Sequence, residues 1–198
     1  MELMKNGLAA SAINRIANAF SQLDKNFNAQ SFKEQALANI EKFELKQRVE
    51  YIIQVMNAHL PGSFKQCIPI FLQIKSVWDY GEESDAFRSF AAWPIIDYVA
   101  EYGLDDPHES LAILKNLTSL FSAEFAIRRF IQKHPDLCHQ YFLKWINDKD
   151  EHVRRLVTEG TRPRLPWGVR LKAFVEDPRA NIVLLDQLAL DESLYVRR

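Results

Sequence analysis

Asp148-Lys-Asp-Glu-His-Val-Arg-Arg155 and Asp191-Glu-Ser-Leu-Tyr-Val-Arg-Arg198 repeat one phrase, D-x-x-x-x-V-R-R. The two copies share four identities in eight positions and lie 43 residues apart. A period near 40 residues in a helical chain is typical of a HEAT-like solenoid, in which helix pairs stack against their neighbours. The phrase therefore predicts an all-α fold, a HEAT-like helical-repeat solenoid.

Each position that is identical in the two copies has an expected role in such a repeat. The aspartate is expected to cap the second helix of a pair, and the valine to enter the core between repeats. The first arginine, Arg154 in the earlier copy, is expected to reach an acceptor in a neighbouring repeat and is therefore predicted to be structural. The next residues, Arg155 and Arg198, lie about 100° further round the helix and are better placed for a ligand.

The rest of the chain has helical periodicity almost throughout. Only six glycines occur, and apolar residues recur at helical spacing. Helices are predicted over residues 8–20, 32–43, 49–56, 68–77, 95–102, 109–120, 123–133, 137–147, 150–159, 167–176 and 180–190. We expect a single repeat domain over 1–198, with a helical cap in 1–85 and the repeats and candidate site in 86–198. Because a helix should begin near residue 193, that domain is expected to be truncated at its C-terminus.

Charge is unevenly distributed along the 198 residues. The net charge is −1, which excludes a generic polyanion binder, and the apolar content of 47% is ordinary for a soluble protein. Residues 121–198 nevertheless carry 14 Lys and Arg against 11 Asp and Glu, whereas residues 1–120 carry 11 against 15. Within 154–172 there are six basic residues and one acidic residue. This local field would attract an anionic partner.

Targeting and metal signals are weak. The start MELMKNGLAASAI lacks the apolar core of a signal peptide, and no run approaches the roughly 18 apolar residues of a membrane span. Cys67 and Cys138 lie far apart without a pairing motif, which suits a reducing cytosol. His134, Cys138 and His139 have possible ligand spacing, but no second cluster completes a metal site. We therefore expect a monomer in the bacterial cytoplasm, associated with the nucleoid when acting, with no membrane, metal or cofactor.

The segment Glu159-Gly-Thr-Arg-Pro-Arg-Leu-Pro-Trp167 carries the strongest chemistry. It places a carboxylate, two guanidiniums and an indole within nine residues, and its two prolines restrict the backbone. A phosphate backbone would suit Arg162 and Arg164, and a cationic reaction centre would suit Glu159 and Trp167. The alternative is an ordinary helix connector, with Trp167 packed on the core or stapling the next helix, and the charged side chains solvated.

Four segments resemble the DNA alkylation repair glycosylases of the AlkC/AlkD type, and AlkC more closely. They are WPIIDYVAEYGLDDP (93–107), SLFSAEFAIRRF (119–130), HVRRLVTEGTRPRLPW (152–167) with RLKAF after it, and SLYVRR (193–198). The match covers roughly residues 90–198. It implies a solenoid whose basic concave face binds duplex DNA containing alkylated bases. It also implies hydrolysis of the N-glycosidic bond of N3-alkylated bases such as 3-methyladenine and 3-methylcytosine.

The resemblance also implies the site residues. The AlkC cleft uses two glutamates and a tryptophan, which match Glu124, Glu159 and Trp167 here. AlkC proteins continue with an acidic cleft residue on the helix that starts here at 193, and many add an immunoglobulin-like domain; this sequence includes neither. The basic residues expected to bind DNA are Arg128, Arg155, Arg162, Arg164, Arg170, Lys172 and Arg198.

Chemistry alone supports these residue types. A base alkylated at N3 is cationic and leaves readily, so the catalyst must stabilise oxocarbenium character on the sugar. A carboxylate does so by charge and can orient water, and an indole adds a cation–π attraction of about 0.5–2 kcal/mol. The alternative function is a non-catalytic HEAT module that binds DNA or protein, or a relative that binds distorted DNA without excision. Glu159 and Trp167 discriminate, because a pure binder gains nothing from a carboxylate facing phosphates.

Overall fold

The computed structural model describes residues 3–198, and no strand occurs within that range. The chain forms two compact units, one ending at Phe121 and the other spanning Ser122–Arg198. The all-α prediction is confirmed. In chain order the elements are η1 (Met4–Leu8), α1 (Ala10–Leu23), α2 (Ala29–Asn39), η2 (Ile40–Lys42), α3 (Leu45–His59), α4 (Phe64–Val77), η3 (Arg88–Ala92), α5 (Trp93–Tyr102), α6 (Pro107–Leu117), α7 (Glu124–Lys133), α8 (Pro135–Trp145), α9 (Glu151–Gly160), α10 (Lys172–Glu176), α11 (Arg179–Leu188) and α12 (Leu194–Arg197), where η marks a 3₁₀ helix.

Local signals set many helix boundaries. α3 begins with a capping box, in which Glu44 and Gln47 exchange side-chain and backbone hydrogen bonds. α5, α6 and α8 each begin with a proline in the first turn, where its missing N–H costs nothing. α5 ends at Gly103, where a Cβ atom would lie 2.4 Å from the Ser110 hydroxyl. Glycine is therefore required for α6 to approach the end of α5.

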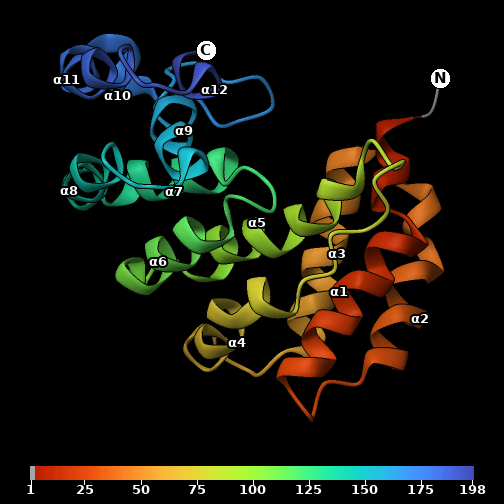
Figure 1. Ribbon diagram of the computed structural model, residues 1–198. Coiled ribbons are helices and arrows are strands. Elements are labelled where there is room, and N and C mark those ends of the chain that lie inside the picture. Colours follow the sequence, from red (N-terminus) through yellow and green to blue (C-terminus); the bar gives the residue numbers. More distant parts are fainter. Residues whose placement is uncertain (1–2) are drawn as a thin grey trace. The chain divides into compact units, whose positions relative to one another are not determined.

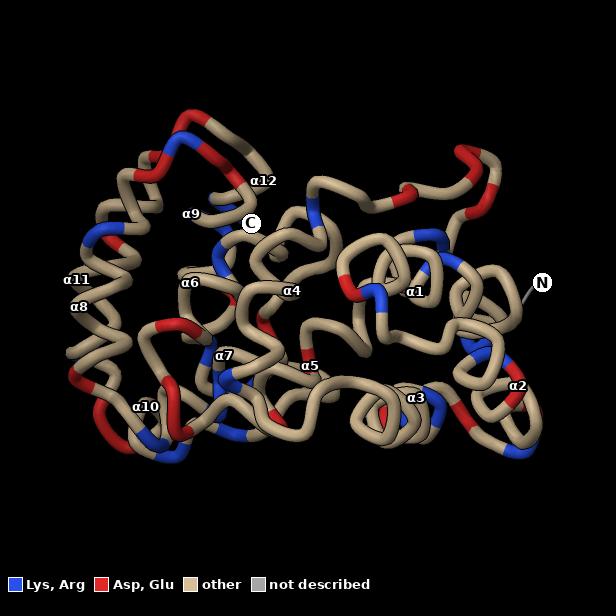
Figure 2. Tube along the Cα trace, turned by 90° about the horizontal axis from the view of Figure 1, so that it is seen from below, with Lys and Arg blue, Asp and Glu red and all other residues tan. Residues whose placement is uncertain are grey.

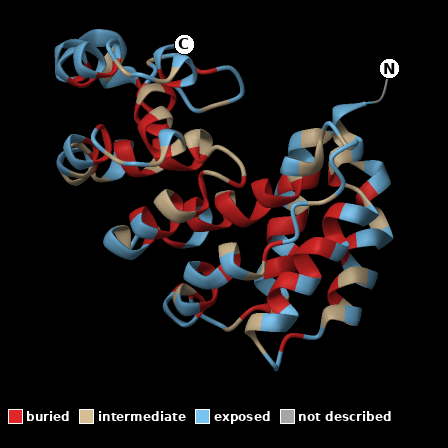
Figure 3. Cartoon of the chain, viewed as in Figure 1, coloured by how far each residue is buried: buried red, intermediate tan, exposed pale blue. Residues whose placement is uncertain are grey.

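The unit that ends at Phe121 has an aromatic core. Phe71 stacks on Tyr98 with 5.1 Å between ring centroids, and Trp93 stacks on Phe121 at the same separation. Figure 3 shows the buried faces of α1, α3 and α5 within this unit. Arg48 is fully buried and donates to backbone carbonyls as well as to the Glu41 carboxylate. These contacts make the unit a packed helical scaffold.

The second unit is a stack of helix pairs, as the repeat predicts. α9 contacts both α7 and α12, which places these three helices in one layer (Figure 1). α8 packs on α7 and α9, and α11 packs on α9, so they form the other member of each pair. Burial differs among these helices: most of α9 is buried, whereas α10 and α11 are more exposed (Figure 3).

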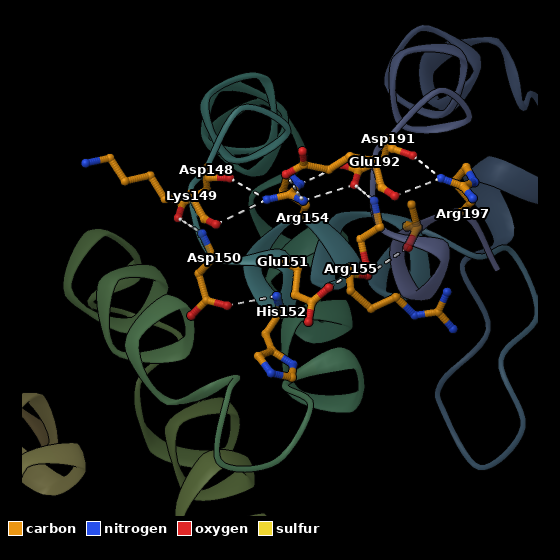
Figure 4. Close-up of polar contacts among 12 residues, drawn as sticks. Asp148, Lys149, Asp150, Glu151, His152, Arg154, Arg155, Asp191, Glu192 and Arg197 are labelled. Carbon is orange, nitrogen blue, oxygen red and sulfur yellow. Dashed lines mark hydrogen bonds and ion pairs between the residues drawn. The ribbon is translucent and has the colours of Figure 1, made fainter.

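A buried ion pair links the two copies of the repeated phrase. Arg154 is 8% exposed, and its Nε and Nη2 donate to the two carboxylate oxygens of Asp191 at 2.6 and 3.0 Å. Asp191 opens the second copy, so Arg154 reaches the neighbouring repeat as predicted (Figure 4). A two-pronged arginine–carboxylate contact of this kind fixes orientation as well as distance.

The two copies also share their local contacts. Val153 and Val196 are both buried, which confirms their place in the core between repeats. In each copy the first arginine donates through Nη1 to the two carbonyls that open the phrase: Arg154 to Asp148 (2.8 Å) and Lys149 (3.3 Å), and Arg197 to Asp191 and Glu192. The same contacts recur 43 residues apart, so the period is structural.

The predicted caps are wrong by two residues. α9 begins after Asp150, whose Oδ1 accepts the backbone N–H of His152 at 2.9 Å. Asp148 and Asp191 instead accept the backbone N–H two residues later, from Asp150 at 3.0 Å and from Ser193 at 2.8 Å. These are Asx turns, and they shape the approach to the helix without capping it.

Candidate functional site

Glu159 is a buried carboxylate held by two arginines. It lies in the last turn of α9 and is 6% exposed. Arg155 Nη2 lies 2.9 Å from its Oε1, and Arg162 Nη1 lies 2.9 Å from its Oε2. A helix C-terminus disfavours an anion, and the two guanidiniums offset that effect. The alternative of a solvated glutamate at a helix end is therefore wrong.

Glu124 belongs to the same charged cluster. It is the first residue of α7, where the helix dipole favours an anion, and it accepts a hydrogen bond from the Ser122 hydroxyl at 2.9 Å. Burial raises the pKa of the Glu124 carboxyl, and the charge of Glu159 raises it further. The Ser122 hydrogen bond and the charges of Arg155 and Arg162 act in the opposite direction. The two carboxylates therefore interact electrostatically across the contact between α7 and α9.

Trp167 occupies a turn position that usually takes glycine. Gly168 N–H donates to the Leu165 carbonyl at 3.1 Å, with Pro166 and Trp167 at the two central positions. The φ of Trp167 is +64°. Proline followed by a residue of positive φ is the pattern of a type II turn, whose third position favours glycine or asparagine. A bulky residue there is strained by about 1 kcal/mol or more, and such strain concentrates at functional sites.

This turn corrects two expectations about the segment. The helix predicted from residue 167 begins only at Lys172, because the turn and an irregular stretch occupy the residues before it. Trp167 is 54% exposed, so it neither packs on the core nor staples the following helix. The indole is instead presented at the surface of the unit.

Arg128 fixes the backbone of this loop. It is fully buried in α7, and its guanidinium donates to four carbonyls: those of Val169 (2.6 Å), Arg162 (2.7 Å), Gly160 (3.0 Å) and Pro163 (3.4 Å). The prediction that Arg128 binds DNA is wrong, because a guanidinium buried among carbonyls cannot reach a phosphate. Its role is to hold the loop that carries Trp167.

Further contacts place Glu159 and the loop. Asn181 of α11 is buried and donates from Nδ2 to the Thr161 carbonyl at 2.9 Å. At Gly160 an added Cβ would lie 2.6 Å from Cγ2 of Ile127, so only glycine lets α9 approach α7 this closely. Sequence reasoning did not single out Gly160 or Asn181. Neither side chain is charged, and the roles of both residues depend on tertiary packing.

The other basic residues predicted to bind DNA differ in how far their side chains are exposed. The Arg162 side chain is half exposed, and Figure 2 shows basic segments of the second unit beside α7 and α10. The Arg155 side chain is only 16% exposed, and its guanidinium is turned onto Glu159. Arg155 therefore does not form the outward-facing ligand contact expected from its helix position. The exposed basic residues of the predicted set are Arg162, Arg164, Arg170, Lys172 and Arg198.

Tyr195 also belongs to the cluster, although the sequence reasoning omitted it. Arg155 lies over its ring at 5.2 Å from the centroid and donates to its backbone carbonyl at 3.0 Å. Burial raises the pKa of the Tyr195 hydroxyl, with Arg155 lowering it and the charges of Glu124 and Glu159 among those raising it. The repeat alignment could have found this residue, because Tyr195 corresponds to His152, which shares a face of α9 with Arg155 and Glu159.

Clustered metal ligands and membrane-spanning helices are both absent from the described part of the chain. Within residues 3–198, no group of three or more His, Cys, Asp or Glu side chains is placed to hold a metal ion. Over the same residues, no helix is both long enough and apolar enough to span a membrane.

Comparison with known proteins gives both a fold and a sequence match. A solved structure of Pseudomonas fluorescens alkylpurine DNA glycosylase AlkC, bound to DNA containing an abasic site analogue, matches 100% of this chain with a TM-score of 0.87 and 32% identity. Over its whole length, the chain is similar to AlkC in both fold and sequence. The similarity confirms the resemblance to the AlkC/AlkD type and extends it over the whole length.

A curated protein is also similar along the whole chain. It is the uncharacterized protein YhaZ of Bacillus subtilis (strain 168), which is 29% identical over 197 residues. No family model matches the sequence. The chain spans about half the length of the AlkC structure and of YhaZ, 53% and 52% respectively.

Proposed function

We propose that this AlkC-like chain carries the active site of a DNA glycosylase that removes cationic N3-alkylated bases from duplex DNA. The AlkC structure is that of an alkylpurine DNA glycosylase on DNA with an abasic site analogue, which is the kind of product such a reaction leaves. The observation that carries the proposal is the buried Glu159 carboxylate, held by two arginines beside Glu124. Residues 1–85 as a cap, the monomeric state and the cytoplasmic location stay predictions.

The proposed mechanism needs no acid to protonate the base. An N3-alkylated adenine is cationic and leaves as a neutral base, taking the electron pair of the N-glycosidic bond. Positive charge then develops on the deoxyribose, and Glu159 would stabilise it electrostatically. Glu159 would also orient the attacking water and accept its proton as the new C–O bond forms.

Burial makes the carboxylate more effective in this role. Charges interact more strongly where water is excluded, so a carboxylate that is 6% exposed stabilises a nearby cation more than a solvated one. Arg155 and Arg162 fix its direction, which removes the cost of reorienting it during the reaction. Glu124 would add a second negative charge, and the Trp167 indole would contact the sugar or the cationic base through its π face.

A non-catalytic DNA-binding module is the competing function. Such a module needs exposed cations, which this unit has, but it has no use for two interacting carboxylates beside them. It also has no reason to keep a large aromatic residue at a strained turn position. Both features favour excision over binding alone. Release of free 3-methyladenine from methylated duplex DNA distinguishes the two functions.

DNA binding is predicted to depend on exposed arginines of the loop. Arg164→Ala removes an exposed cation from the loop that carries Trp167. The slope of log binding constant against log salt should fall by about one, with a similar loss of affinity on every duplex sequence. Fluorescence anisotropy over a salt series measures this slope. Lys144→Ala on α8, also exposed, serves as the control, and an equal effect of both changes would contradict a specific role for the loop.

Trp167 is predicted to serve function at the expense of stability. Trp167→Gly places the favoured residue at a position of φ +64°, so the free energy of unfolding should not fall and can rise by up to about 1 kcal/mol. Base excision should nevertheless slow by about tenfold, which corresponds to losing about 1.4 kcal/mol of contact to the sugar or base. Urea denaturation and single-turnover excision measure the two effects. A destabilised variant with unchanged excision would show that Trp167 is structural.

A further inference from the structure

We propose that Tyr195 is a positioning residue for the Glu159 carboxylate and acts through Arg155. This inference rests on the proposed glycosylase function and adds to it a contribution from the neighbouring repeat. Glu159 and Arg155 lie on α9, whereas Tyr195 lies on α12. The carboxylate would therefore be aimed by a side chain 36 positions further along the chain.

The geometry forms a continuous series of contacts. Arg155 Nη2 lies 2.9 Å from Glu159 Oε1, and Arg155 Nη1 donates to the Tyr195 carbonyl at 3.0 Å. The guanidinium carbon lies 5.2 Å from the centroid of the Tyr195 ring, within range of a cation–π contact. Tyr195 therefore contacts Arg155 with both its backbone and its ring. An arginine restrained in this way has little freedom to turn away from Glu159.

The ring itself is held in place from α9. His152 packs its edge against Tyr195, with 5.4 Å between ring centroids and an interplanar angle of 71°. Tyr195 is 42% exposed, so it adds little to the apolar core. Burial raises the pKa of the Tyr195 hydroxyl, and the nearby charges of Glu124 and Glu159 raise it further.

The repeat ladder sets the position of α12. The Arg154 guanidinium donates two hydrogen bonds to the Asp191 carboxylate just before this helix. The Ser193 hydroxyl donates to the Glu151 carboxylate at the start of α9. Arg154 and Arg155 are adjacent, so the ion pair of Arg154 with Asp191 and the contact of Arg155 with Glu159 arise from consecutive residues. Figure 4 shows the first of these contacts. The packing of one repeat on the next is thereby coupled to the orientation of Glu159.

The test compares two substitutions of Tyr195. Tyr195→Leu removes the ring face and keeps the backbone carbonyl, so the single-turnover excision rate should fall about tenfold. The dissociation constant for duplex DNA should change by less than about twofold, because the carboxylate and not a phosphate contact is affected. Tyr195→Phe keeps the ring and should restore the rate to within about twofold of the unmutated chain. Excision by Tyr195→Leu at the unmutated rate would overturn the proposal.

A control and a double variant separate positioning from a general packing defect. Tyr141 on α8 carries Lys144 over its ring at 5.7 Å, so Tyr141→Leu removes a similar cation–π contact away from Glu159 and should leave excision unchanged. In an Arg155→Met background, Tyr195→Leu should add less than about a twofold loss, since the residue through which it acts is gone. Independent, multiplicative losses would contradict the proposed route.

A stability measurement tests the contact between Arg155 and Tyr195 even if the chain releases no base. The effects of Arg155→Met and Tyr195→Leu on the unfolding midpoint in urea should not add, because each removes the same contact. If the unmutated chain releases no base but these effects are non-additive, the glycosylase proposal fails while the positioning of Arg155 by Tyr195 stands. Additive effects would overturn the positioning itself.

Discussion

Glu159→Gln is expected to abolish most base excision while leaving affinity for duplex DNA unchanged or slightly raised. Glutamine keeps the size of the side chain and much of its hydrogen bonding but loses the negative charge. A charge that stabilises the developing oxocarbenium ion contributes only as the glycosidic bond breaks, so the rate should fall by about 100-fold or more. Binding of the ground state should gain slightly, because one negative charge beside the DNA is removed.

Single-turnover release of 3-methyladenine from methylated duplex DNA measures the rate, and anisotropy measures affinity. Glu176→Gln provides a matched control, since Glu176 is an exposed carboxylate in α10 of the same unit. That variant should excise at the unmutated rate. Because Glu159 also pairs with two arginines, circular dichroism should confirm that Glu159→Gln stays folded. Excision by folded Glu159→Gln at the unmutated rate would place the catalytic charge elsewhere.

Arg128→Met is expected to destabilise the second unit by about 3 kcal/mol or more. Methionine fills part of the space but leaves four backbone carbonyls without their donor, and unsatisfied buried polar groups are costly. The loop that presents Trp167 should lose its fixed conformation, so excision should fall as well.

Urea denaturation of the full chain measures this loss, with protease sensitivity near residues 161–171 as a second readout. Arg129→Met is the matched control, because Arg129 is the next residue of α7 and is partly exposed. It should change the free energy of unfolding much less. Equal stability of the two variants would show that the loop is held by other contacts.

The repeat was predictable because its cause is local in sequence. D-x-x-x-x-V-R-R predicted the period, the buried valines and the reach of Arg154 to an acceptor in the neighbouring repeat, all of which the structure confirms, with Asp191 as the acceptor. Helix existence followed from apolar spacing, and proline or glycine marked ends such as Gly103. The caps were displaced because Asp148 and Asp150 are both capable of accepting a backbone N–H. Asp150 is the cap because α9 begins at Glu151, directly after it.

The candidate site was less predictable, for a physical reason. Arg128, Arg155 and Arg164 look alike in sequence, yet one holds a loop, one pairs with Glu159 and one is exposed. Which role an arginine takes depends on the carbonyls and carboxylates that tertiary packing brings near it. Trp167 posed a similar difficulty, because a positive φ is expected of glycine and nothing in the sequence predicts it for tryptophan.

Release of free base from N3-methylated duplex DNA by the folded 198-residue chain tests the proposed glycosylase activity most directly. We expect 3-methyladenine to appear in solution under single-turnover conditions and an abasic site to remain in the strand. We also expect release without an added metal or cofactor. A folded chain that binds the methylated duplex but liberates no base would contradict the glycosylase proposal and leave a DNA-binding module in its place.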